Sequence, residues 1–76
     1  MIPENTKYSI DLYVSDKIPT GGFLRAVLTN DLFGAMGRAD LENRHSLWEI
    51  CDYIYNEIPA DCWGSVEKVE AWLGNE

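Results

Sequence analysis

Residues 40–58, DLENRHSLWEICDYIYNEI, decide the fold class of this 76-residue chain. Apolar side chains recur there at the spacing that lines one face of an α-helix: Leu47, Ile50, Cys51, Ile54 and Ile58. Asp40 suits an N-cap. Pro59 ends the helix, because the residue before a proline is pushed out of the helical conformation. The stretch therefore predicts one amphipathic helix over residues 40–58, with Trp48, Cys51 and Ile54 buried.

The segments on either side of this helix also carry helical signals. Ser65 is a suitable N-cap and Gly74 a suitable C-cap for a final helix over residues 65–73, which would bury Val69 and Trp72. Upstream, Thr-Gly-Gly at residues 20–22 introduces a short helix, and Asn-Asp at residues 30–31 caps a second one. One bent helix also fits this region. Glycines inside a helix cost about 1 kcal/mol against alanine, so Gly34 and Gly37 suggest close helix packing.

The N-terminal segment is compatible with two structures. Residues 8–14 alternate apolar and polar side chains, as in a strand. However, Pro3 suits a first helical turn, and Ile10, Tyr13 and Val14 share a helical face. A strand would find no second alternating segment to pair with, which favours the helix. We therefore predict an all-α fold, a compact single domain of four to five short helices over residues 1–76.

Charge narrows the function. Thirteen acidic residues against six lysines and arginines give a formal net charge of −7. Such a field attracts basic partners and repels nucleic acid and anionic membranes. Mimicry of a nucleic acid would require the acids to gather on one side. The candidates are Glu42, Glu49, Asp52 and Glu57 on the polar face of the predicted long helix, joined by Asp31 and Asp61.

The loop at residues 60–65 contains a tryptophan next to a glycine. Trp63 would either close two helices together as part of the core or stand exposed as an interface anchor, since tryptophan is a common hot spot. In the second case Asp61 and Glu57 would form an acidic rim around it. Trp63 is therefore counted with the candidate partner-binding residues.

The sequence gives little support for a catalytic, metal-binding or phosphate-binding site. His45 is the only imidazole, and no nucleophile motif surrounds Ser46 or Ser65. Cys51, Cys62 and His45 lack the spacing of zinc ligands, and the glycines before residue 23 lack the lysine of a phosphate-binding loop. We therefore expect no enzyme activity, no metal and no cofactor, with two unbridged cysteines of which Cys51 is buried and inert. Without a signal-peptide pattern or a long apolar run, a cytoplasmic location is expected.

Several stretches resemble a family of small phage and prophage proteins. They are residues 18–28 (IPTGGFLRAVL), 53–57 (YIYNE), 62–65 (CWGS) and 67–69 (EKV), with shorter matches at residues 30–32 and 38–40, at Asn43 and at Pro59. The resemblance covers roughly residues 2–73. It implies an accessory protein made in the cytoplasm of a bacterial host, and a helical start for the chain.

By analogy, small acidic phage proteins often look like inhibitors of host defence, including anti-CRISPR proteins. The leading hypothesis is a non-enzymatic, DNA-mimic-like protein that occludes the basic, nucleic-acid-binding surface of a host protein or nucleoprotein complex. It would bind neither nucleic acid nor membrane directly, and a monomer is favoured. The alternative is a structural or regulatory interaction module of the phage, whose acidity only serves solubility.

Overall fold

The computed structural model describes residues 1–74, and within them the chain is all-α, as predicted. The elements are α1 (Glu4–Asp16), α2 (Gly22–Leu28), α3 (Leu32–Arg38), α4 (Leu41–His45), α5 (Leu47–Glu57), the short 3-10 helix η1 (Ala60–Cys62) and α6 (Val66–Leu73). The described residues contain no strand. Residues 8–14 lie within α1, so the helical interpretation of that segment is correct.

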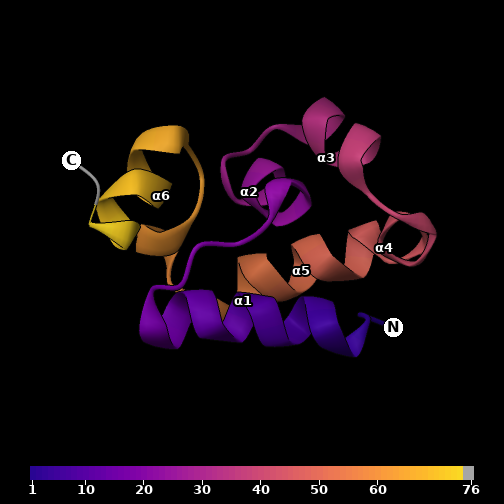
Figure 1. The fold of residues 1–76 in the computed structure, drawn as a ribbon, viewed down its shortest axis with the longest axis horizontal. Helices are drawn as coiled ribbons and strands as arrows, with labels where there is room; N and C mark the ends of the chain where they lie inside the picture. The colour runs from indigo at the N-terminus through magenta and orange to yellow at the C-terminus, as the bar shows by residue number, and fades with distance from the viewer. Residues whose placement is uncertain (75–76) are drawn as a thin grey trace.

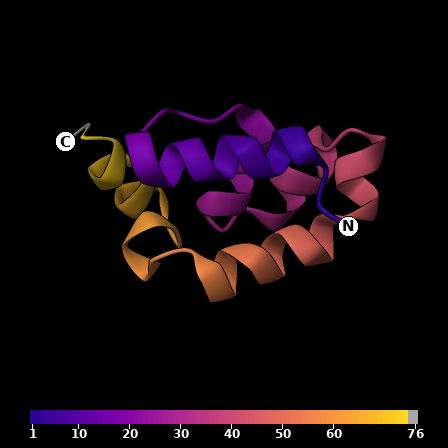
Figure 2. The same ribbon diagram turned by 90° about the horizontal axis from the view of Figure 1, so that it is seen from below.

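Helices α1 and α5 run along the length of the molecule, and α2 packs against both (Figures 1 and 2). The pair α3 and α4 stands at one end, and η1 with α6 at the other (Figure 1). The core lies where these elements meet, and its buried members are Ile10, Tyr13, Leu24, Leu28, Ile50, Ile54, Ile58, Cys62 and Val69. None of the helices in residues 1–74 combines the length and the apolarity needed to span a membrane.

Three helices begin at the side-chain caps that the sequence predicts. The side chains of Asp31, Asp40 and Ser65 accept hydrogen bonds from backbone N–H groups three residues on, at 3.0, 2.8 and 3.1 Å. Gly74 ends α6 in the left-handed conformation, with φ 85°. These caps satisfy backbone donors that the first turn of a helix leaves without partners.

The prediction of one continuous helix over residues 40–58 is wrong, because the chain turns at Ser46 between α4 and α5. Ser46 is buried, with φ −105° and ψ 11°, and its hydroxyl donates a 2.6 Å hydrogen bond to the carbonyl of Met1. Helical propensity and pattern are weak priors that tertiary contacts can override. The break at residues 29–30 is confirmed: α2 and α3 are separate helices.

Two expectations about packing are also wrong. Trp48 is 75% exposed, because α5 turns Ile50 and Ile54 toward the core instead. In the described structure, no atom beyond its own helical turn and chain neighbours lies within 4 Å of a Cβ placed at Gly37, so close helix packing does not explain this glycine. A Cβ at Gly34 would collide with the carboxylate of Asp31, so that glycine makes room for the cap of α3. Of the other residues predicted to be buried, Val69 is, and Trp72 is half-buried.

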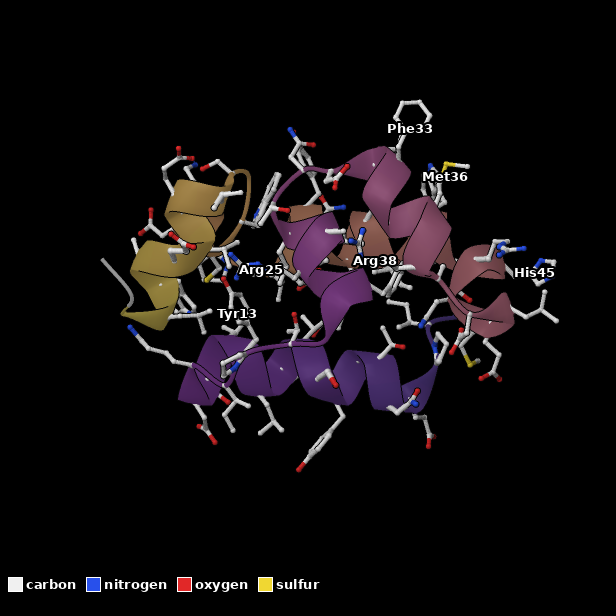
Figure 3. All side chains as sticks on the ribbon, turned by 45° about the horizontal axis from the view of Figure 1, so that its top comes forward. Tyr13, Arg25, Phe33, Met36, Arg38 and His45 are labelled. Atoms are coloured by element: carbon white, nitrogen blue, oxygen red, sulfur yellow. The ribbon has the colours of Figure 1, made fainter. Side chains whose placement is uncertain are left out.

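Hydrogen bonds between distant segments hold α1, η1 and α6 together, and we call this region the α1–η1–α6 junction. The Tyr13 hydroxyl donates to the carbonyl of Cys62 at 2.7 Å, and the Trp72 indole N–H donates to the carbonyl of Tyr13 at 2.9 Å. Figure 3 shows Tyr13 directed from α1 into the molecule. Burial raises the pKa of the Tyr13 hydroxyl to about 12. The junction fixes the start of the loop that carries Trp63.

Candidate protein-binding surface on helix α5

A hollow of about 330 Å³ lies between α5, the end of α2 and the loop after η1. Its lining residues are Val27, Asn30, Trp48, Cys51, Asp52, Ile54, Tyr55 and Trp63. A smaller hollow of about 70 Å³ shares three of these residues (Val27, Asn30 and Cys51) and continues to α3, where Asp31 and Leu32 border it. We refer to the two hollows together as the aromatic groove.

The helical repeat of α5 places one wall of this groove on the surface. Trp48 and Tyr55 are seven residues apart, so both project from the same side of the helix, with Cys51 and Asp52 between them. Trp48 is 75% and Tyr55 72% exposed. Helix α5 therefore carries two apolar stripes. The isoleucines are buried in the core, and the aromatic rings face solvent.

Trp63 is neither fully buried nor fully exposed, so its position lies between the two that the sequence left open. Its side chain is half-buried against the core, and its ring lies 5.8 Å from that of Tyr55, centroid to centroid, with the planes tilted by 57°. The backbone N–H of Gly64 donates to the carbonyl of Leu28 at 2.7 Å and fixes the loop to α2. Among the described residues, no group accepts a hydrogen bond from the buried Trp63 indole N–H. The ring thus packs on the core and forms a wall of the groove.

An acidic depression of about 590 Å³ lies next to the groove, on another side of α5. Its lining residues are Ile2, Glu49, Asp52, Tyr53, Asn56 and Glu57. Asp52 borders both the depression and the groove. Among the described residues, no lysine or arginine side chain lines either of them. The α-amino group of Met1 lies 3.1 Å from the carboxylate of Glu49, in an exposed ion pair that contributes little stability.

The structure brings together some of the candidate acids and separates others. Glu49, Asp52 and Glu57 line the acidic depression, and Asp31 lies at the far end of the aromatic groove. Glu42 on α4 and Asp61 in η1 are exposed but line neither. Their part in binding stays a prediction, as does that of the grouped acids.

Cys51 is exposed, so the prediction that it is buried is wrong, and its low reactivity stays a prediction. It lies on the aromatic stripe of α5 and borders both hollows of the groove. Partial burial raises the pKa of its thiol. Cys62 is fully buried in the core, and burial, followed by the negative charge of Asp61, raises its pKa. Both cysteines are free thiols.

The sequence patterns did not indicate Val27, Asn30, Trp48 and Tyr55 as lining residues of a site. The spacing of the two aromatic residues carried a usable signal, because rings seven residues apart lie on one side of a helix. No such signal marked Val27 and Asn30, which reach the groove from the end of α2. Other large apolar side chains are exposed on α3, where Phe33 and Met36 point away from the body of the molecule (Figure 3).

The described residues give this surface no histidine and no group of metal ligands. His45 is exposed on α4, at the end of the molecule opposite α6 (Figure 3), and lines neither the groove nor the depression. Within residues 1–74, no three histidine, cysteine or acidic side chains are placed to share a metal ion. The described surface of α5 has aromatic rings on one side and carboxylates on the other.

Comparisons with known proteins add no relatives: no family model, no curated protein and no solved structure matches this chain. The resemblance to phage proteins therefore stays a prediction.

Proposed function

We propose that this protein binds and occludes a basic surface of a host protein or nucleoprotein complex, and that it acts without catalysis. The observation that carries the proposal is the position of Asp52, where the aromatic groove meets the acidic depression. Tryptophan and tyrosine are enriched at the energetic centres of protein interfaces. Carboxylates beside them would steer a basic partner into register and speed association.

A host-defence nuclease complex is the partner class that we propose, in the manner of an anti-CRISPR protein. Support comes from the resemblance to phage proteins and from the net charge of −7. Duplex DNA carries one negative charge per about 1.7 Å of its axis, well above the density on this protein. The proposed mode is therefore local occlusion by α5 rather than imitation of a whole duplex.

The alternative is an interaction module of the phage itself, whose acidity only keeps it soluble. The groove favours this reading in one respect, because its walls are mostly apolar and could bind a partner without charge. Added salt separates the two proposals, since it screens attraction between exposed charges but leaves apolar burial in place. Binding that weakens steeply with salt supports occlusion of a basic surface.

The proposal is tested with a tagged protein produced in an infected bacterial host, followed by mass spectrometry of co-purifying proteins. A double variant, Glu49→Lys with Asp52→Lys, reverses charge in the acidic depression. The matched control, Asp16→Lys with Glu67→Lys, makes the same change in net charge at exposed sites that line neither the groove nor the depression. We expect the first variant to lose a basic partner that the control retains. We also expect the wild-type protein to block nucleic-acid binding by that partner.

Two results would contradict this function. In the first, both variants retain the partner equally, so that the charges on α5 have no special role. In the second, the partner binds nucleic acid as tightly in the presence of the protein as in its absence, so that no basic surface is occluded.

A further inference from the structure

We propose that the aromatic groove holds an arginine side chain of the partner. Its guanidinium lies between Trp48 and Tyr55 and forms an ion pair with the carboxylate of Asp52. The inference rests on the proposed function and deepens it, because it names the chemical group that the groove recognises. The hollow of about 330 Å³ lies at the small end of the range for ligand pockets, about 300–1,000 Å³. It suits one long side chain rather than a folded element.

The positions along α5 fit this arrangement. With a rise of about 1.5 Å per residue, Trp48 and Tyr55 are about 10 Å apart along the helix axis. Asp52 lies between them, about 6 Å from the level of Trp48 and about 4.5 Å from that of Tyr55. A flat cation that enters between the two rings would therefore meet a carboxylate at the floor.

The groove lacks a cation of its own. In the part of the chain that the structure describes, Asp52 forms no ion pair and accepts a hydrogen bond only from the amide of Asn56, at 2.8 Å. Aromatic faces attract cations through their negative quadrupole, most strongly when water is excluded. Three aromatic rings and one carboxylate without an ion pair among the described residues thus present to a partner a surface that attracts cations.

Arginine fits this surface better than lysine. A guanidinium is planar, stacks on aromatic faces, is weakly hydrated and meets a carboxylate with two parallel hydrogen bonds. A lysine ammonium is compact and strongly hydrated, so it loses more on leaving water. The walls formed by Trp48, Tyr55 and Trp63 are flat rings, which match the shape of a guanidinium.

Capped tripeptides test the inference without knowledge of the partner. The probes are Ala-Arg-Ala, the same peptide with lysine, and the same peptide with citrulline, which keeps the shape of arginine but lacks its charge. The readout is the rate at which iodoacetamide, a neutral reagent, labels Cys51. This thiol borders the groove, and the chain's other cysteine, Cys62, is buried.

We expect the arginine peptide to slow the labelling of Cys51 in a saturable manner. The lysine peptide should bind at least threefold more weakly and the citrulline peptide at least tenfold more weakly. Asp52→Asn should weaken binding of the arginine peptide at least fivefold, and so should Trp48→Ala. The control Glu67→Gln, which also removes one charge but lies on α6, should leave binding within twofold of the wild-type value.

Three outcomes would overturn the inference. Equal weakening by Asp52→Asn and Glu67→Gln would mean that the peptide senses only the overall field. Equal protection of Cys51 by the arginine and citrulline peptides would mean that the groove recognises the shape of the side chain and not its charge. Protection of Cys51 that rises with protein concentration in the absence of peptide would mean that a second copy occupies the groove.

The two proposals can fail separately. If the partner depends on Glu49 and Asp52 but arginine peptides do not protect Cys51, the occlusion function stands and the arginine site falls. If arginine peptides bind at the groove but the double variant Glu49→Lys with Asp52→Lys keeps every partner, the arginine site is supported and the occlusion function is contradicted.

Discussion

The α1–η1–α6 junction and the aromatic groove use the same residue types in opposite ways. At the junction, the polar tips of Tyr13 and Trp72 donate to backbone carbonyls. In the groove, the Trp63 indole N–H has no hydrogen-bond partner among residues 1–74, and Trp48 and Tyr55 are exposed to solvent. An aromatic side chain stabilises the fold when its ring is buried and its polar group is satisfied. The groove meets neither condition fully, so its rings are available to a partner.

Helix α5 makes the same contrast within eleven residues. Ile50 is fully buried and Ile54 is 3% exposed, whereas Trp48 and Tyr55 are about three-quarters exposed. One helix therefore supplies a core stripe and a surface stripe. The following experiments separate the two contributions.

The largest expected contrast is between the two thiols. Iodoacetamide should label Cys51 in the native protein, because it is exposed, whereas Cys62 should react only when the core opens. For a domain with a stability of about 5 kcal/mol, opening reduces the rate at least a thousandfold. Mass spectrometry of peptides from a labelling time course measures both rates. Comparable rates would show that the junction is not closed around Cys62.

Truncations on the two stripes of α5 should differ by several kcal/mol. Ile50→Ala removes a fully buried side chain and should lower the free energy of unfolding by about 2–5 kcal/mol. Trp48→Ala removes a larger side chain that lies mostly in water, and should change it by less than about 0.5 kcal/mol. Urea denaturation followed by circular dichroism gives both values. A large loss for Trp48→Ala would mean that its ring supports the fold.

The contrast also shows which features the sequence could predict. The caps at Asp31, Asp40 and Ser65 are local, since each bonds to a backbone group three residues away. The hydroxyl of Ser46, at the turn between α4 and α5, donates to the carbonyl of Met1, forty-five residues away, and no spacing reveals that contact. Spacing did identify Ile50, Ile54 and Ile58 as one helical face, which is buried, but it could not show that the neighbouring Trp48 stays outside the core.

The candidate site divides in the same way. Helical spacing sufficed to place Glu49 and Asp52 on neighbouring turns of one helix. The groove itself depends on tertiary contacts, because Val27 and Trp63 reach it from segments that are distant in the sequence. The residues that line the groove therefore could not be predicted from the sequence.

The buried hydroxyl of Tyr13 should make the junction sensitive to alkali. Since burial raises its folded pKa to about 12, against about 10 in an unfolded chain, its contribution is complete below pH 10. It is lost as the pH rises from about 10 to 12, by up to about 2–3 kcal/mol. Tyr13→Phe should remove this loss while costing about 1–3 kcal/mol at neutral pH, because the Cys62 carbonyl loses its donor. Urea midpoints at pH 7 and pH 10.5 provide the measurement.

Tyr53 should show a smaller effect than Tyr13, because its hydroxyl makes a similar bond in a more exposed place. Its hydroxyl donates to Asp11 at 2.7 Å, and this bond, followed by that from Lys7, holds the pKa of Asp11 below its usual range. A lowered carboxyl pKa stabilises the fold above the unfolded value of about 4, and the contribution disappears as the pH falls through the folded pKa. The Asp11 side chain is 46% exposed, so solvent screening limits the effect. Tyr53→Phe should therefore lower the free energy of unfolding by less than about 1 kcal/mol at pH 7, and by less still at pH 2.5, as measured by urea denaturation. A cost equal to that of Tyr13→Phe would show that burial does not set the difference between the two tyrosines.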